Sequence, residues 1–367
     1  MSNTLSKDFF LATKTCDGFF SVFDHLYYPN DGWFCYILKG GPGTGKSTLM
    51  KKIAEKAEKL HIETEQIHCS SDPKSLDAVI FPKLKVCVAD GTAPHIIEPK
   101  IPGVSEKIIN LGDFWNEKKR RKNSETLIRL FEENEYFHKK ASVYLKALGD
   151  VKKSQNFILE KAIDYKKLEN FAKKLSESIF ENIKYEKAPT EKLRFIEGVT
   201  PEGYKIFENS VNYGAKSTYI IENKNEMISS YLLQKIRSEA TKRNMDITSF
   251  FTALFPKKYL RAVYLSEISA ILMAKNPKTE SDLFYNLKNA KKINTSKFLN
   301  TETLKLHKNL LGLYEKISTE LLKKATENLS LALQNHDKIE EIYTSAMDYK
   351  KVNKTADKLI SAIFTNN

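Results

Sequence analysis

The stretch that decides the fold is Trp33-Phe34-Cys35-Tyr36-Ile37-Leu38-Lys39-Gly40-Gly41-Pro42-Gly43-Thr44-Gly45-Lys46-Ser47-Thr48-Leu49-Met50. A short apolar run leads into a glycine-rich turn, and apolar residues then recur at helical spacing from Leu49 to Ala57. Gly-x-x-x-x-Gly-Lys-Ser between a strand and a helix is the Walker A pattern, whereas the same letters alone can form an ordinary glycine turn. The context therefore predicts a strand, a phosphate-binding loop and a helix.

The residue types in this loop suit a nucleoside triphosphate. Glycines let the backbone curve around an anion with its N–H groups pointing inward, and the start of the next helix attracts negative charge. Lys46 is placed as a charge on the β- and γ-phosphates, and the Ser47 hydroxyl as a ligand of Mg²⁺. We expect ATP rather than GTP by default, because no convincing Asn-Lys-x-Asp guanine motif is present. The expected nucleotide-binding residues are Gly40, Gly41, Pro42, Gly43, Thr44, Gly45, Lys46, Ser47 and Thr48.

Further strands surround this unit. Residues 9–28 are expected to form a small β-hairpin around Asp17-Gly18, and residues 62–68, 76–81 and 84–89 are expected to form strands or strand-like segments. Strands that alternate with a helix predict an α/β fold with a mostly parallel sheet flanked by helices. Ligands of such sheets bind at the carboxyl ends of the strands.

Asp90 closes the apolar run Leu84-Lys85-Val86-Cys87-Val88-Ala89, which has the form of a Walker B strand. Its carboxylate is expected to hold Mg²⁺ together with Ser47. The alternative is a turn role, because Asp-Gly favours turns without any metal. Gly91 stands where many hydrolytic enzymes of this type carry a glutamate, so the general base must come from elsewhere.

Three other side chains are candidates for proton transfer. Asp72, His95 and Glu98 are expected in loops at the same edge of the sheet, where each could orient water or an acceptor hydroxyl. Each also has a plain role as a turn or cap residue. We assign Lys46, Asp90, Asp72 and His95 as the candidate catalytic residues.

Residues 115–180 are expected to be helical. An approximate heptad stripe, interrupted by Asn134, comprises Leu127, Leu130, Phe137, Ala141, Tyr144, Leu148 and Val151. Gly149-Asp150 is a candidate turn between two antiparallel helices. We expect this helical hairpin to pack on its own domain, and a partner-binding arm is the alternative.

The second half of the chain repeats the first. Ala162-Ile163-Asp164-Tyr165-Lys166-Lys167 recurs as Ala346-Met347-Asp348-Tyr349-Lys350-Lys351, with an offset of 348 − 164 = 184. Phe10-Leu11 likewise matches Phe195-Ile196. We therefore expect two tandem domains, residues 1–185 and 190–367, with helical hairpins at about 115–180 and 300–364, joined by a linker in Glu181–Lys192.

The second copy has lost the loop chemistry. Asn223-Lys224-Asn225-Glu226-Met227-Ile228-Ser229-Ser230 stands where the first copy has Gly40 to Ser47, so the glycines are gone and Ser229 replaces Lys46. The counterpart of Asp90 falls near Met273, without an acid. This half should keep the fold without binding nucleotide, and it is expected to pack against the first half as an internal pseudo-dimer partner.

Composition limits the remaining possibilities. The 367 residues carry a net charge of +13, but the lysines are spread along segments that also contain glutamate, so a solvated helix surface explains them better than nucleic-acid binding. The basic cluster at 118–122 keeps nucleic acid as a minor alternative. No apolar run approaches a bilayer span and no signal pattern opens the chain, so we expect no membrane association and a cytoplasmic location. The four cysteines form no Cys-x-x-Cys pair and are expected to be reduced core thiols.

Three segments extend the pattern beyond the phosphate loop: His68-Cys69-Ser70-Ser71-Asp72-Pro73-Lys74-Ser75-Leu76-Asp77, Asp90-Gly91-Thr92-Ala93-Pro94-His95 and Ile108-Ile109-Asn110-Leu111-Gly112-Asp113. With the loop, they resemble a family of duplicated bacterial P-loop ATPase-like proteins of spore-forming, low-GC Gram-positive bacteria. The resemblance covers essentially the full length and implies ATP binding, without an established substrate. Members commonly carry a phosphate loop in both halves, so the eroded second loop departs from the family pattern.

The function expected from these observations is that of an ATP-binding, Mg²⁺-dependent P-loop NTPase, an ATPase with one functional and one degenerate site. A small-molecule kinase is the first alternative, with Asp72 or His95 accepting the proton of an acceptor hydroxyl. A non-catalytic switch is the second, in which nucleotide repositions the helical hairpins for a partner protein.

Overall fold

The computed structural model describes residues 6–181, 183–207, 210, 214–222, 225–275 and 290–365. The strands are β1 (Ser6–Phe9), β2 (Ala12–Thr15), β3 (Gly18–Ser21), β4 (Phe34–Lys39), β5 (Thr64–His68), β6 (Leu76–Phe81), β7 (Val86–Asp90), β8 (Glu106–Asn110), β9 (Glu191–Arg194), β10 (Glu197–Thr200), β11 (Gly203–Ile206), β12 (Ser217–Glu222), β13 (Ile247–Phe251), β14 (Leu260–Leu265), β15 (Ala270–Lys275) and β16 (Lys291–Asn294). The helices are α1 (Lys46–Lys59), α2 (Glu117–Arg121), α3 (Ser124–Glu160), α4 (Tyr165–Phe180), α5 (Glu226–Lys242), α6 (Thr301–Leu306), α7 (Lys308–Thr344) and α8 (Tyr349–Phe364).

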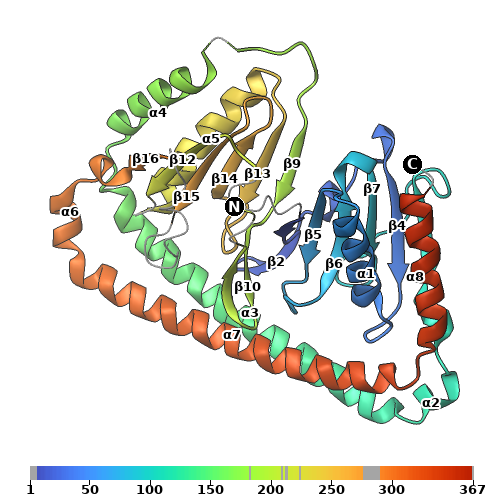
Figure 1. The fold of residues 1–367 in the computed structure, drawn as a ribbon. Coiled ribbons are helices and arrows are strands. Elements are labelled where there is room, and N and C mark those ends of the chain that lie inside the picture. Colours follow the sequence, from blue (N-terminus) through green and yellow to red (C-terminus); the bar gives the residue numbers. More distant parts are fainter. Residues whose placement is uncertain are drawn as a thin grey trace.

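Each half of the chain contributes one six-stranded sheet (Figure 1). The first has the order β1-β5-β6-β7-β4-β8, and the second has the matching order β9-β13-β14-β15-β12-β16. The expected α/β class is confirmed, but the sheets are mixed because β6 runs antiparallel to both β5 and β7. Only the short turn Pro82–Leu84 joins β6 to β7, and a parallel pair needs a much longer crossover.

The two halves meet around an approximate two-fold axis. Phe10 and Phe195, which match in the sequence repeat, exchange both backbone hydrogen bonds, with N···O distances of 2.8 and 2.9 Å. Their side chains are fully buried in a cluster that also contains residues of both sheets. The expectation that the second half packs against the first is therefore confirmed.

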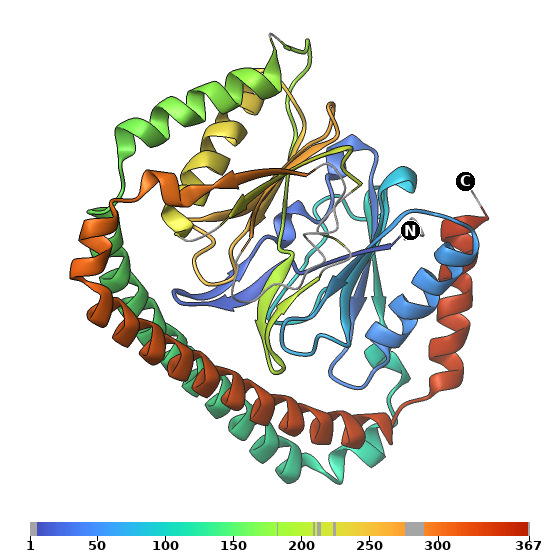
Figure 2. The same cartoon turned by 60° about the vertical axis from the view of Figure 1, so that its left-hand side comes forward.

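The helices α4 and α8 are exchanged between the halves. Although α8 follows the second sheet in the chain, its apolar residues Val352, Ala356, Leu359 and Ile363 pack with α1 and the first sheet. Likewise, α4 follows the first sheet but packs with α5 and the second sheet. Figure 2 shows α8 beside α1 and α4 beside α5. The expectation that the helical hairpin of the first half packs on its own domain is wrong for α4, whereas α3 does pack on Cys16 of its own half. Boundaries at 185 and 190 therefore separate the repeats but not the packed units.

Reciprocal backbone contacts fix this exchange. Asn116 N–H donates to Ala346 C=O at 2.8 Å, and its counterpart Asn300 N–H donates to Ala162 C=O at 2.7 Å. Asp348 N–H similarly donates to Phe114 C=O, as Asp164 N–H does to Phe298 C=O; these pairs differ by the repeat offset of 184. Each exchanged helix is thus tied at its start to the segment that follows the last strand of the opposite sheet.

The long helices α3 and α7, of 37 residues each, lie side by side along one edge of the molecule (Figure 1). They are antiparallel, because Asn134 of α3 bonds Ala332 of α7 while Lys152 pairs with Glu315. The candidate turn at Gly149 is wrong, since α3 continues through it. Glycine is needed there because a Cβ would lie 2.7 Å from the Cβ of Cys16. None of the described helices has the length and apolar character needed to cross a membrane.

Candidate functional site

The loop between β4 and α1 has the backbone shape that its sequence predicts. Gly43 and Gly45 have φ values of 68° and 86°, in the left-handed region that glycine adopts without a steric cost. Thr44 is fully buried, and its hydroxyl donates to Gly41 C=O at 2.9 Å. The loop is therefore held in a tight turn at the start of α1.

Lys46 and Asp90 meet beneath this loop. The strands β4 and β7 are neighbours, with Leu38 opposite Asp90, so both strands end at the same edge. Lys46 Nζ lies 3.5 Å from Asp90 Oδ2 and donates to the carbonyl oxygens of Gly40 and Gly41, at 2.6 and 2.9 Å. The structure thus brings together the lysine and the acid that the sequence selects.

The two residues expected to hold a metal also have other partners. The Ser47 hydroxyl oxygen accepts a hydrogen bond from Leu76 N–H at 3.0 Å. Asp90 Oδ1 accepts from Thr92 N–H and Oγ1–H, which is the expected turn role, while Oδ2 faces Lys46. Hydroxyl and carboxylate oxygens are the ligand types that Mg²⁺ prefers, so this donor set fits the ion.

A cavity of about 740 Å³ opens above the loop. The loop forms its floor, and residues from 69–77 and 90–95 form one wall. The opposite side is formed by α3 and α7, through residues that include Phe131, His138 and His336. A volume of this size is within the range of sites that bind drug-sized ligands, so the cavity has room for more than a phosphate group.

The three candidate bases lie in different settings. Asp72 lines the cavity, but it accepts hydrogen bonds from Ser75 Oγ–H and Lys74 N–H and therefore shapes its own turn. Glu98 pairs with Lys39 at 2.6 Å and is absent from the described cavity lining. The catalytic role of Asp72 stays a prediction.

His95 lies in the cavity wall and is held there on two sides. Its Nε2 is 3.3 Å from Asp77 Oδ2, and its ring stacks on Phe23 with 4.3 Å between centroids. Its Nδ1 is buried and has no hydrogen-bond partner among the described residues. Asp77, which the sequence reasoning missed, also lines the cavity and is the carboxylate that holds His95 in place.

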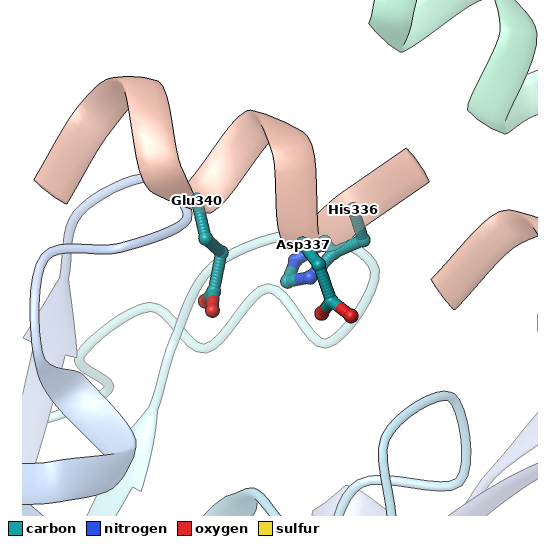
Figure 3. Close-up of side chains that lie close together, drawn as sticks. All are labelled: His336, Asp337 and Glu340. Carbon is teal, nitrogen blue, oxygen red and sulfur yellow. The ribbon is translucent and has the colours of Figure 1, made fainter. Parts of the chain in front are cut away.

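The second half of the chain contributes directly to the site. Glu340 of α7 accepts a hydrogen bond from Gly43 N–H at 3.2 Å, and the Tyr349 hydroxyl of α8 donates to Gly43 C=O at 2.7 Å. Figure 3 shows Glu340 on α7 together with His336 and Asp337. Ligand atoms of these three residues lie within 4.8 Å of one another. The glycine-rich loop is therefore contacted by two helices, α7 and α8, from the other repeat.

The pseudo-equivalent junction between β12 and α5 has a different chemistry. Asn223 and Lys224 lie outside the described residues, but Asn225 Oδ1 caps α5 by accepting from Met227 N–H at 2.8 Å. Ser229, in the place of Lys46, is 1% exposed and donates to a backbone carbonyl. The strand register pairs Ile221 with Ala274, so Ala274 is the structural counterpart of Asp90.

The sequence reasoning also missed Glu340 and Tyr349 as residues that contact the loop. Tyr349 belongs to the repeated segment Asp348-Tyr349-Lys350-Lys351, which marked the duplication but gave no sign of a site. Compared with protein-family models, curated proteins and solved structures, the chain gives no significant match.

Proposed function

We propose that this protein is a Mg²⁺-dependent P-loop NTPase that binds and hydrolyses ATP at one site, in the first half of the chain. The observation that carries the proposal is the position of Lys46, whose ammonium group lies between two loop carbonyls and the Asp90 carboxylate. A lysine held at this point meets the phosphates of a nucleotide cradled by the loop N–H groups.

Each residue then has a separate task. On nucleotide binding, Lys46 exchanges the carbonyl oxygens of Gly40 and Gly41 for phosphate oxygens, which offer full negative charge. Ser47 and Asp90 are the oxygen ligands offered to Mg²⁺, which would neutralise charge on the transferred phosphoryl group. The side chains of α3 and α7 limit the access of bulk water to the cavity and so strengthen these interactions.

A phosphotransferase is the second candidate, because the cavity extends from the loop to Phe131, His138 and His336. An acceptor molecule bound there would lie beside the nucleotide, and Asp72, Asp77 and Glu340 are cavity carboxylates that could take its hydroxyl proton. A nucleotide-dependent switch is the third, supported by the contacts of Glu340 and Tyr349 with the loop. The resemblance to duplicated P-loop ATPase-like proteins agrees with all three.

The proposal is tested by phosphate release from ATP with and without Mg²⁺, using wild-type protein, Asp90→Asn and Asp31→Asn. Asp90→Asn removes a carboxylate charge from the metal ligands without changing side-chain size, so we expect Mg²⁺-dependent turnover to fall about tenfold or more. Metal-free nucleotide binding should change much less. Asp31, with a side chain 70% exposed, controls for charge loss elsewhere. An unaltered Mg²⁺ dependence would reduce Asp90 to its turn role.

Reaction products separate the three candidates. The ATPase releases phosphate without an added acceptor, whereas the kinase transfers it to a component of a metabolite extract. Nucleotide binding without either outcome supports the switch. Absence of ATP binding by the folded protein would contradict the proposal as a whole.

A further inference from the structure

Three basic side chains gather at the part of the cavity formed by α3, α7 and the β2–β3 hairpin. His138 of α3 and His336 of α7 line the cavity. Lys14 of β2 lies opposite Phe19 of β3, so the two side chains share a face of the hairpin, and Phe19 also lines the cavity. The hairpin packs on α3 through Cys16 and Ala141, which places Lys14 near His138. The charges of Lys14 and His336 both act on His138.

Among the described residues, Lys14 and His138 lack the anionic partners that partly buried bases normally have. Nδ1 of His138 is buried without a hydrogen-bond partner among the described residues, and no described carboxylate forms an ion pair with Lys14. Burial lowers the pKa of the Lys14 ammonium group. Burial, with Lys14 and His336 nearby, lowers the pKa of His138 to about 4. Each group would be stabilised in its charged form by an anion from outside the protein.

Two carboxylates border this cluster on one side. Asp337 and Glu340 lie close to His336 on α7, as Figure 3 shows. Glu340 is bound to Gly43 N–H, at the phosphate loop. His336 precedes Glu340 by four residues, which is about 6 Å along a helix. The basic cluster therefore lies about one helical turn from the nucleotide loop.

In the described part of the chain, no such cluster lies at the equivalent place beside the eroded junction. In the β2–β3 hairpin the repeat offset is 185, as for Phe10 and Phe195, so Lys14 corresponds to Val199; by the offset of 184, His138 corresponds to Leu322. His336 corresponds to Lys152, which is paired with Glu315 at 3.4 Å. The basic cluster is thus found beside the intact loop and not beside the eroded one.

We propose that Lys14, His138 and His336 bind the anionic group, a phosphate or carboxylate, of a small second ligand that lies beside the nucleotide. An anion at this point would accept hydrogen bonds from the lysine and the imidazoles, while the rest of the ligand extends toward the loop. This inference rests on the proposed function, because it gives the nucleotide site an acidic acceptor or effector molecule.

The test is calorimetric titration of Lys46→Ala protein with inorganic phosphate and, separately, with succinate, because this background removes the main phosphate contact of the loop. We expect saturable binding of one anion per chain, weakened about tenfold by Lys14→Met or His138→Gln, which each remove a charge-assisted hydrogen bond. Lys14→Arg keeps the charge and should retain binding. Lys83→Met, which alters a side chain 75% exposed, should bind as the background does. Phosphate should also raise the pKa of His138, measured by NMR of its ring protons.

Preference for phosphate or for succinate identifies the anionic group. Equal anion affinity in Lys14→Met, His138→Gln and Lys83→Met would overturn the site, as would saturable binding of Zn²⁺ but not of either anion. Wild-type protein is titrated in parallel with a non-hydrolysable ATP analogue. Analogue binding without anion binding refutes this inference alone, whereas anion binding without analogue binding refutes the proposed function.

Discussion

The two strand–loop–helix junctions of this chain share a framework but not a chemistry. Ser47 at the first junction accepts a hydrogen bond from Leu76 N–H at 3.0 Å, and Ser230 at the second accepts one from Leu260 N–H at the same distance. The first loop has glycines and Lys46, whereas at the second an Asn225 side chain caps the helix. The fold therefore persists without the glycines and the lysine of the first loop.

Charged side chains of the protein lie at the second junction. At Glu226, in the place of Gly43, desolvation raises the pKa of the carboxyl group, with Lys152 and Arg261 acting in the opposite direction. Arg261 and Glu197 form a buried ion pair at 2.9 Å. A phosphate would have to replace these internal partners. The two junctions therefore differ in their side-chain contacts as well as in their glycines.

The largest expected effect concerns the segment that connects the two repeats. Cleavage at an engineered protease site within residues 183–189 should leave the two fragments associated, because α4 and α8 each complete the core of the other fragment. Size-exclusion chromatography and native mass spectrometry at micromolar concentration measure this association. Fragments that separate freely would contradict the exchange of helices.

A second prediction compares equivalent residues of the two junctions. Lys46→Ala should weaken binding of ATP by about a hundredfold or more while leaving the fold intact, because Lys46 supplies charge to the ligand rather than core packing. Ser229→Ala, its counterpart, should leave ATP affinity unchanged. Calorimetry should also give one nucleotide per wild-type chain. A stoichiometry near two, or unchanged ATP affinity in Lys46→Ala, would contradict the expectation that only the first half binds ATP through Lys46.

A third prediction uses acid stability. Because the pKa of His138 is lowered to about 4 in the folded state, the unfolded chain binds more protons below pH 6.5, and His138 reduces stability as the pH falls from 6.5 toward 4. His138→Leu copies the counterpart Leu322 and removes this effect. On going from pH 7 to pH 5, the variant should lose about 2 kcal/mol less unfolding free energy than wild type. Urea denaturation at both pH values measures the unfolding free energy. Equal losses in the variant and in wild type would contradict the lowered pKa of His138.

The smallest expected effect is at Glu340, whose carboxylate accepts a hydrogen bond from Gly43 N–H and repels phosphate. Glu340→Gln removes the charge, so ATP affinity should rise a few-fold. The equivalent residue, on the first-half helix α3 near the second junction, is the neutral Asn156, which donates to Tyr259 Oη. Asn156→Asp should not alter ATP affinity. A lower affinity in Glu340→Gln would mean that the carboxylate assists binding.

Much of the framework could be predicted because it depends on local patterns. The glycine spacing and the apolar runs indicate the β4–loop–α1 unit, and the adjacent strand ends bring Asp90 to Lys46. The exchange of α4 and α8 could not be predicted from the repeat. The two helices are similar and the two sheets are similar, so an apolar face that fits one sheet also fits the other.

Contacts between segments that are distant in the sequence also could not be predicted. Glu340 and Tyr349 lie about 300 positions from the loop that they contact, and no local pattern relates them. Gly149 was misread because a glycine followed by aspartate resembles a helix end, whereas here it permits close contact with Cys16. Such contacts depend on how the two halves assemble.

The exchange of helices also has a consequence for protein synthesis. The ribosome makes the nucleotide loop early, but α8, which packs on α1 and places Tyr349 beside Gly43, is made after both sheets. A nascent or truncated chain that ends before residue 349 therefore lacks one wall of the cavity and part of the core of its first sheet. The cavity is thereby completed only after translation has passed through the second repeat, so only chains that contain both repeats acquire all of its walls.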